Sequence, residues 1–173
     1  IQHYGLTDAD LDSTFHTGDL NIGKEQATLR EIQQALEATY CGTIGAEFTH
    51  IVDSEQRRWF QQRLESVRSR PEFSPEVRTH ILERLTAGEG LERYLGTRYP
   101  GTKRFGLEGG ESLIPLMDEI IQRSGSYGAK EIVVGMAHRG RLNVLVNTYG
   151  KNPRDLFDEF DGKRVEGLTS GDV

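Results

Sequence analysis

Apolar residues recur at helical spacing through the first hundred positions of the chain. One stripe follows Thr28 and Glu31, whose spacing is that of a capping box. A second follows Asp53, a residue type favoured just ahead of a helix, and a third follows Ser74-Pro75, where proline suits the first helical turn. These features predict amphipathic helices that each bury one face. The stripes are Leu29, Ile32, Leu36 and Tyr40; Trp59, Phe60 and Leu64; and Val77, Ile81, Leu85, Leu91, Tyr94 and Leu95.

The start of the chain continues the same pattern. Leu6, Leu11 and Phe15 predict a short first helix, and no stretch ahead of Arg98 has the pattern of a convincing strand. Residues 1–98 are therefore predicted to be a helical segment.

The pattern changes at the turn sequence Tyr-Pro-Gly of residues 99–101, which is the best internal boundary. Residues 113–121 predict a helix, and residues 131–136 hold three consecutive β-branched side chains, which is typical of a buried strand. A polar turn and further helices follow this strand. The order of helix, strand, turn and helix is that of an α/β layer. The predicted fold class is α/β, with residues 1–98 as the helical segment and residues 99–173 as the beginning of an α/β domain whose sheet is incomplete.

Composition narrows the class of protein. The 173 residues suffice for one domain, or for one with a small appendage, and 35% apolar with 28% charged residues is enough to bury a core. A net charge of −6 argues against binding to the nucleic-acid backbone. No apolar run approaches the roughly 20 residues of a membrane span, and no basic-plus-apolar leader opens the sequence. The single Cys41 excludes an internal disulfide, and the histidines lack metal-ligand spacing. We predict no nucleic-acid partner, no membrane partner and no metal ligands in this chain.

One candidate for ligand binding follows the predicted strand. His138 and Arg139 come directly after it, and ligands of open α/β sheets bind beyond the carboxyl ends of strands. A helix N-terminus comes next, which favours an anion, and an imidazole there can donate a hydrogen bond or transfer a proton near neutral pH. The alternative for His138 is a structural role in the turn, and the alternative for Arg139 and Arg141 is a solvated surface position. The spacing leaves these alternatives open.

Residues 103–110 form a second candidate, with two cations and a glycine pair. Arg104 and nearby backbone N–H groups can hold a phosphate there. The segment is neither a Walker loop nor the Gly-x-Gly-x-x-Gly pattern of dinucleotide sites, and an ordinary surface loop is the alternative.

The same residues lie in motifs that resemble the E1 component of the 2-oxoglutarate dehydrogenase complex. Residues 103–111 (KRFGLEGGE) and 135–145 (GMAHRGRLNVL) carry the resemblance, and residues 40–51 (YCGTIGAEFTHI) and 87–95 (AGEGLERYL) extend it. Residues 170–173 match the family just ahead of a block that this chain does not contain. The resemblance covers nearly the whole chain and is greatest to bacterial enzymes.

This resemblance implies thiamine diphosphate-dependent oxidative decarboxylation of 2-oxoglutarate and transfer of the succinyl group to the lipoyl group of E2, the dihydrolipoyl succinyltransferase. Arg104 matches an arginine that contacts the cofactor near its diphosphate. His138 matches a histidine of the substrate pocket that recognises or protonates the 2-oxo acid. Phe105 and Leu107 are implied neighbours in the pocket wall, Phe105 on the substrate side and Leu107 on the cofactor side. Residues 99–173 then begin the thiamine diphosphate-binding domain.

Several family features are not in this chain. They are the Gly-Asp-Gly/Ala…Asn segment that holds Mg²⁺ and the diphosphate, the second pocket histidine, and the glutamate that activates the cofactor ring. We therefore expect an N-terminal-region fragment of a cytoplasmic bacterial enzyme, inactive by itself and homodimeric when full-length. The related 2-oxoadipate dehydrogenase E1 is one alternative, and a non-catalytic helical interaction module is another.

Overall fold

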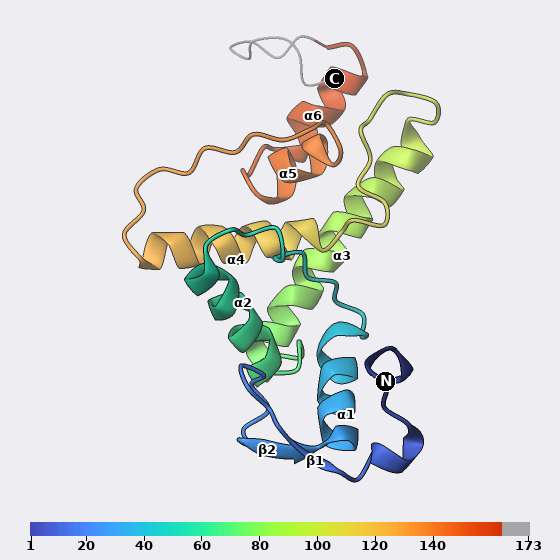
Figure 1. The fold of residues 1–173 in the computed structure, drawn as a ribbon. Coiled ribbons are helices and arrows are strands. Elements are labelled where there is room, and N and C mark those ends of the chain that lie inside the picture. Colours follow the sequence, from blue (N-terminus) through green and yellow to red (C-terminus); the bar gives the residue numbers. More distant parts are fainter. Residues whose placement is uncertain (164–173) are drawn as a thin grey trace. The chain divides into compact units, whose positions relative to one another are not determined.

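The structure, a computed structural model, describes residues 1–163 and is mainly helical (Figure 1). The chain divides into two compact units, Ile1–Glu72 and Phe73–Val173. The last family-like residues, 170–173, lie outside the described part. Within residues 1–163, no helix combines the length and the apolar character that crossing a membrane requires.

The first unit contains a β-hairpin, whereas the sequence predicts a short helix through Leu6, Leu11 and Phe15 and no strand. Phe15 lies in strand β1 (Thr14–His16) and pairs with Ala27 of the antiparallel strand β2 (Gln26–Thr28). Both predictions are therefore wrong. The pairing joins residues that are distant in sequence, and helical spacing carries no information about such a partner. Two short 3-10 helices precede the hairpin, Gln2–Tyr4 and Asp8–Asp10.

The helices of the first unit, α1 (Leu29–Tyr40) and α2 (Ser54–Ser66), begin where the sequence predicts. The hydroxyl of Thr28 accepts the backbone N–H of Glu31 at 3.2 Å, and the Glu31 carboxylate accepts the backbone N–H of Thr28 at 2.9 Å. This is the predicted capping box, and it satisfies two backbone donors of α1 that have no partner within the helix. Hydrogen bonds from the Lys24 ammonium and from Thr28 lower the pKa of Glu31 to about 2.

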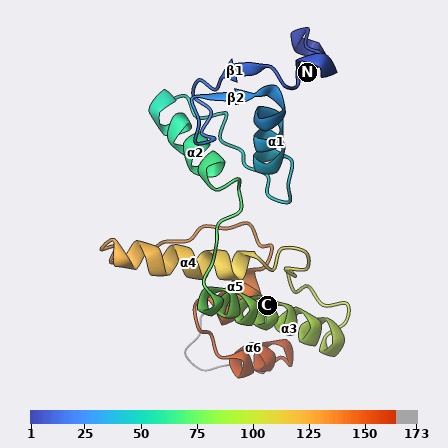
Figure 2. The same cartoon turned by 90° about the horizontal axis from the view of Figure 1, so that it is seen from below.

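The second unit is built around a long helix, α3 (Pro75–Arg98), which begins behind the predicted cap Ser74. Figure 2 shows α4 (Leu113–Ser126), α5 (Arg141–Asn147) and α6 (Pro153–Phe160) grouped around it. Their apolar faces meet in two buried clusters, which fix the loops between the helices. These clusters are Leu95, Leu142 and Leu156, and Leu107, Ile114 and Val144.

The predicted buried strand at residues 131–136 is not formed. Residues 129–137 are an irregular, extended segment between α4 and α5 (Figure 1), and within it Val133 is 94% exposed. No strand of the described residues pairs with this segment, and a buried strand needs a neighbour to satisfy its backbone N–H and C=O groups. The fold is thus helical with one small antiparallel sheet, which is compatible with the α/β class.

The predicted domain boundary after residue 98 falls at the C-terminal end of α3, inside the second compact unit. The division between the compact units lies between Glu72 and Phe73. That residues 99–173 begin a cofactor-binding domain stays a prediction.

Candidate functional site

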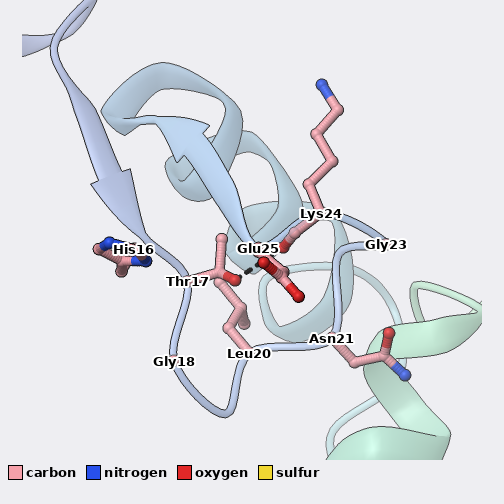
Figure 3. Close-up of a pocket in the computed structure, with 8 residues that line it drawn as sticks. All are labelled: His16, Thr17, Gly18, Leu20, Asn21, Gly23, Lys24 and Glu25. Atoms are coloured by element: carbon pink, nitrogen blue, oxygen red, sulfur yellow. Dashed lines mark hydrogen bonds between the residues drawn. The ribbon is translucent and has the colours of Figure 1, made fainter.

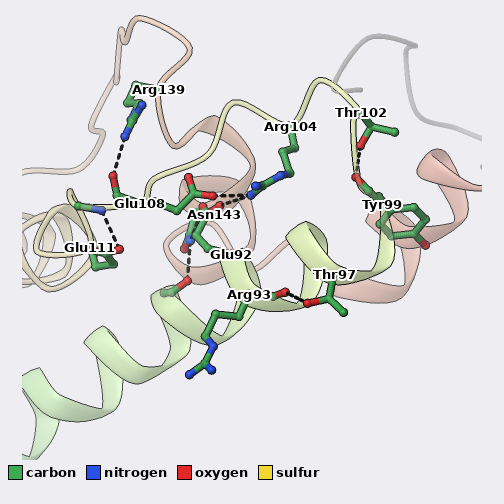
Figure 4. A network of polar contacts seen from close by, with 12 residues as sticks. Glu92, Arg93, Thr97, Tyr99, Thr102, Arg104, Glu108, Glu111, Arg139 and Asn143 are labelled. Carbon is green, nitrogen blue, oxygen red and sulfur yellow. Dashed lines mark hydrogen bonds and ion pairs between the residues drawn. The ribbon is translucent and has the colours of Figure 1, made fainter.

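Two motif segments of the second unit, the loop ahead of α4 and the turn ahead of α5, lie against each other. The backbone N–H of Gly140 donates to the carbonyl of Phe105 at 2.7 Å, and the guanidinium of Arg139 donates to the carbonyl of Glu108 at 2.6 Å (Figure 4). The ring centroids of Phe105 and His138 are 4.8 Å apart. The fold therefore brings these two predicted site residues into contact.

Phe105 is surrounded by positive charge. The Nζ atom of Lys103 lies 5.2 Å from its ring centroid and the Cζ atom of Arg141 lies 4.8 Å away, distances at which a cation is attracted to an aromatic face. The backbone φ of Phe105 is 48°, in the left-handed region that costs a side-chain-bearing residue about 1–2 kcal/mol. His138, which is exposed, therefore stands beside a strained aromatic residue that two cations contact. This arrangement suits an anionic ligand.

Arg104 holds its guanidinium between two carboxylates (Figure 4). Its Nη1 atom is 2.6 Å from Oε1 of Glu108 and 3.4 Å from Oε2 of Glu92, which is buried on α3. A Cβ atom on Gly96 would lie 3.3 Å from Nη2 of Arg104, so the absence of a side chain there gives the guanidinium room against α3. Hydrogen bonds from its own backbone and from Arg104 lower the pKa of Glu108.

Asn143 connects this arginine to α5. It is fully buried, and its Nδ2 atom donates to the carbonyl of Gly88 at 2.9 Å and to Oε1 of Glu92 at 3.0 Å (Figure 4). Its Oδ1 atom accepts from Nδ2 of Asn147 at 2.7 Å. The two oxygens of Glu92 are thus bonded to different groups, one to Asn143 and one to Arg104. This carboxylate holds α3, α5 and the loop ahead of α4 together.

The sequence motifs did not indicate Glu92 or Asn143 as site residues. Both residues can nevertheless be found from the sequence, because each is a polar residue that interrupts an apolar pattern. Glu92 stands four residues after Gly88 and three before Leu95, on the face of α3 that is buried. Asn143 stands between two buried residues of α5. A buried polar side chain needs a hydrogen-bond partner, and two such side chains predict a shared hydrogen-bond network.

Leu107 has a different environment from the other predicted residues. It is 2% exposed and packs against Ile114 and Val144 in the core. A Cβ atom on Gly140 would lie 2.5 Å from Cδ1 of Leu107. The turn ahead of α5 and the loop ahead of α4 are therefore packed too closely at this point to admit a side chain. Leu107 therefore anchors the loop ahead of α4 in the core, and its contact with the cofactor stays a prediction.

Arg104 lines an open cavity of about 350 Å³ in which carboxylates outnumber cations. His138, Phe105 and Leu107 are not part of its lining. The residues of this lining are Glu89, Glu92, Arg93, Gly96, Thr97, Arg104, Glu108 and Glu111.

A larger cavity of about 480 Å³ lies in the first unit, within the loop that joins β1 to β2 (Figure 3). The Thr17 hydroxyl in its wall donates to the carbonyl of Lys24 at 2.7 Å, a bond that closes the loop on itself. None of the predicted site residues lines it. Among residues 1–163, no group of three or more His, Cys, Asp and Glu side chains is placed to hold a metal ion.

Curated proteins are similar to this chain along its whole length. A protein of Azotobacter vinelandii is 76% identical over 173 residues, which are 100% of this chain and 18% of the relative. A protein of Cupriavidus necator is 60% identical over 98% of the chain, and one of Haemophilus influenzae is 50% identical over 99%, each match again being 18% of the relative. No family model matches the chain.

These relatives are E1 components of a dehydrogenase. The name they carry is 2-oxoglutarate dehydrogenase E1 component, so the resemblance drawn from the motifs is confirmed. The chain spans about 18% of the length of the curated relatives it matches.

Proposed function

We propose that this chain is part of a 2-oxoglutarate dehydrogenase E1, which decarboxylates 2-oxoglutarate oxidatively on thiamine diphosphate and passes the succinyl group to the lipoyl group of E2. The observation that supports this most is the identity of 76% along the whole chain to a protein of that name. The motif segments around Arg104 and His138, which carry the family resemblance, also contact each other through Phe105 and Gly140. In the full-length protein we propose a cytoplasmic homodimer that binds E2.

The cavity that Arg104 lines holds more carboxylates than cations, so the assignment of this arginine to a diphosphate cofactor rests on the family resemblance. Thiamine diphosphate, when bound, supplies the electron sink for decarboxylation. The guanidinium of Arg104 already bonds two carboxylates, and the same planar set of donors binds phosphate oxygens. We assign the diphosphate contact to Arg104, with Leu107 supporting its loop, and the Mg²⁺ ligands to residues outside this chain.

His138 and Phe105 are assigned to the substrate. The imidazole of His138 packs against Phe105, and Lys103 and Arg141 lie against that same aromatic ring. The positive charge of these two residues attracts a dicarboxylate such as 2-oxoglutarate. Its N–H donates a hydrogen bond to the substrate, and Phe105 fixes the orientation of the ring.

The test uses the full-length protein and separates the two assignments. Changing His138→Ala should lower kcat/KM for 2-oxoglutarate at least tenfold and leave the Kd of thiamine diphosphate unchanged. Changing Arg104→Gln should instead raise that Kd by about tenfold or more, as expected for a lost charge-assisted hydrogen bond. Turnover of 2-oxoadipate in preference to 2-oxoglutarate by the unmodified protein would favour the alternative dehydrogenase. An unchanged Kd of thiamine diphosphate in Arg104→Gln would contradict the assignment of Arg104 to the diphosphate.

A further inference from the structure

The turn that carries His138 lies at the surface and leads directly into α5. It spans residues 138–141 and is closed by a hydrogen bond from the backbone N–H of Arg141 to the carbonyl of His138 at 2.9 Å. The side chain of His138 is exposed, and its ring contact within the described residues is with Phe105. The orientation of this imidazole therefore depends on what fixes the turn.

Three contacts fix the turn on the loop ahead of α4. Two of them involve Gly140, whose backbone N–H donates to the carbonyl of Phe105 at 2.7 Å and whose lack of a side chain leaves room for Leu107. The third involves Arg139, whose Nη2 atom donates to the carbonyl of Glu108 at 2.6 Å (Figure 4). Of the three, the contact of Arg139 is the nearest in sequence to the imidazole.

The acceptor of this hydrogen bond is itself held in place. The carbonyl of Glu108 belongs to a turn that is closed by a hydrogen bond from the backbone N–H of Gly110 to the carbonyl of Leu107 at 2.8 Å, and Leu107 is buried in the core. The carboxylate of Glu108 is paired with Arg104 at 2.6 Å. A donor bonded to this carbonyl is therefore tied to the core of the second unit.

The chain on the other side of His138 gives no comparable support within the described residues. Residues 129–137 are irregular, and Val133 among them is almost fully exposed. The contacts that fix the imidazole thus come from the residues that follow it and from Phe105.

We infer that Arg139 is a positioning residue for His138: its hydrogen bond to the carbonyl of Glu108 holds the turn in the conformation that presents the imidazole to the substrate. The inference rests on the proposed function, in which His138 binds the 2-oxo acid. A guanidinium suits this task because its donors are charged and lie in a fixed plane, which makes the bond both strong and directional. Its Nη2 atom is directed at the loop (Figure 4), so Arg139 acts through its neighbour.

The first experiment measures steady-state kinetics of the full-length protein with 2-oxoglutarate. Arg139→Gln should lower kcat/KM about three- to tenfold, because the effect of a group at the reacting centre falls steeply when it is displaced. Arg139→Lys, which keeps the charge and a donor on a shorter side chain, should lose less. The matched control is Arg123→Gln, which removes an exposed guanidinium that is paired with Glu119 within α4. The control should leave kcat/KM unchanged.

Salt dependence separates positioning from attraction of the substrate by charge. A long-range attraction is screened by salt, so the loss in Arg139→Gln would then fall between about 50 and about 300 mM salt, and Arg139→Lys would match the unmodified protein. A positioning bond predicts a loss that salt does not change. A loss that disappears at high salt would overturn the inference.

The second experiment combines the variants. Arg139→Gln should cause no further loss of kcat/KM in a protein that already carries His138→Ala, because the guanidinium acts through the imidazole. A merely structural role would lower kcat/KM again in this background, which would contradict the inference. Thermal unfolding verifies that each variant is folded, and Arg139→Lys carries the same test should Arg139→Gln fail to fold.

The third experiment does not depend on activity. Hydrogen-exchange mass spectrometry should detect faster exchange of the backbone amides of residues 138–141 in Arg139→Gln than in Arg123→Gln, because one of the three contacts of the turn is lost. Equal exchange in the two variants would overturn the inference.

The inference and the proposed function can fail separately. If His138→Ala leaves kcat/KM unchanged, the assignment of His138 to the substrate is wrong and the positioning role falls with it. If His138→Ala lowers kcat/KM but Arg139→Gln behaves like Arg123→Gln, only the role of Arg139 is wrong.

Discussion

At the scale of single residues, buried carboxylates organise both units. Glu65 of the first unit is 1% exposed and accepts hydrogen bonds from the backbone N–H of Asn21 at 2.6 Å and from the hydroxyl of Tyr40 at 2.9 Å. Glu92 of the second unit is bonded on both oxygens in the same way. A buried charge is tolerated because each of its oxygens has a donor, so the donors are as important as the carboxylates themselves.

The titration of Tyr40 tests its hydrogen bond to the buried carboxylate of Glu65. Burial, together with its hydrogen bond to the Glu65 carboxylate, raises its pKa to about 12 from 10.0. Between these values the folded protein keeps a proton that the unfolded chain releases, so the free energy of unfolding should fall as pH rises from about 10 to about 12. A tyrosinate absorbance titration should contain a late step near pH 12 that disappears in Tyr40→Phe. A titration of Tyr40→Phe identical to that of the unmodified protein would contradict the assignment.

Gly140 tests the close contact between the two motif segments. Its φ is 74°, and a Cβ atom would also strike Leu107. Gly140→Ala should lower the free energy of unfolding by about 2–4 kcal/mol, from backbone strain plus overpacking. Gly150 is the matched control, because it has a φ of 73° with nothing within 4 Å of an added Cβ. Gly150→Ala should cost only the strain, about 1–2 kcal/mol, in urea unfolding. Equal losses in the two variants would argue against the contact with Leu107.

At the scale of elements, the second unit depends on close approach of α4 and α5 to α3. Gly88 of α3 has no side chain at the point where Ile114 of α4 packs, and a Cβ atom there would lie 3.4 Å from Cγ1 of Ile114. The carbonyl of the same glycine accepts the amide of Asn143 from α5. One small residue thus permits both an apolar and a polar contact. The helices are held by specific contacts at these positions as well as by their apolar faces.

Asn143→Leu tests this junction. Leucine has the same branching of its side-chain heavy atoms but cannot donate to the carbonyl of Gly88 or to the carboxylate of Glu92, and both acceptors would remain buried. We expect a loss of about 2–4 kcal/mol in the free energy of unfolding, measured by denaturant titration. Asn143→Asp, which keeps the shape but places a second carboxylate beside Glu92, should cost at least as much. A loss below about 1 kcal/mol in both variants would show that the network contributes little.

At the scale of the whole molecule, the described residues leave apolar surface uncovered in a segment whose sequence is typical of a buried strand. Ile132 is 39% exposed and Val133 is 94% exposed. The chain spans about 18% of the length of its curated relatives, so most of the polypeptide of such proteins is not represented here. A β-branched run becomes a strand only when neighbouring strands supply hydrogen-bond partners.

The full-length protein should therefore protect this segment. We expect the backbone amides of residues 131–136 to exchange with deuterium slowly in the full-length protein, at rates closer to those of α3 than to those of the loop over residues 17–25. Hydrogen-exchange mass spectrometry measures this directly. Rapid exchange throughout residues 131–136 would indicate that the irregular conformation persists and that the predicted strand does not form.

The sequence predicted the helices well because their signals are local. The caps at Thr28, Asp53 and Ser74 act on backbone N–H groups two or three residues away, and all three helices begin as predicted. The hairpin of β1 and β2 was missed because its pairs join residues 14–16 to residues 26–28, beyond the range of a helical repeat. Of the candidate site, the motifs indicated Arg104, Phe105, Leu107 and His138. They did not indicate that Glu92 and Glu108 bind Arg104, or that Asn143 binds Glu92.

By itself, then, the sequence determined where α1, α2 and α3 start, which short segments carry charge beside glycine, and which proteins the chain is similar to. These properties depend on residue order and on contacts within a few positions. Only the tertiary structure decided that Phe105 meets His138 and that Arg104 is shared by Glu92 and Glu108. Such contacts depend on which helix faces pack together, and the packing buries Glu92 but leaves Glu108 half-exposed.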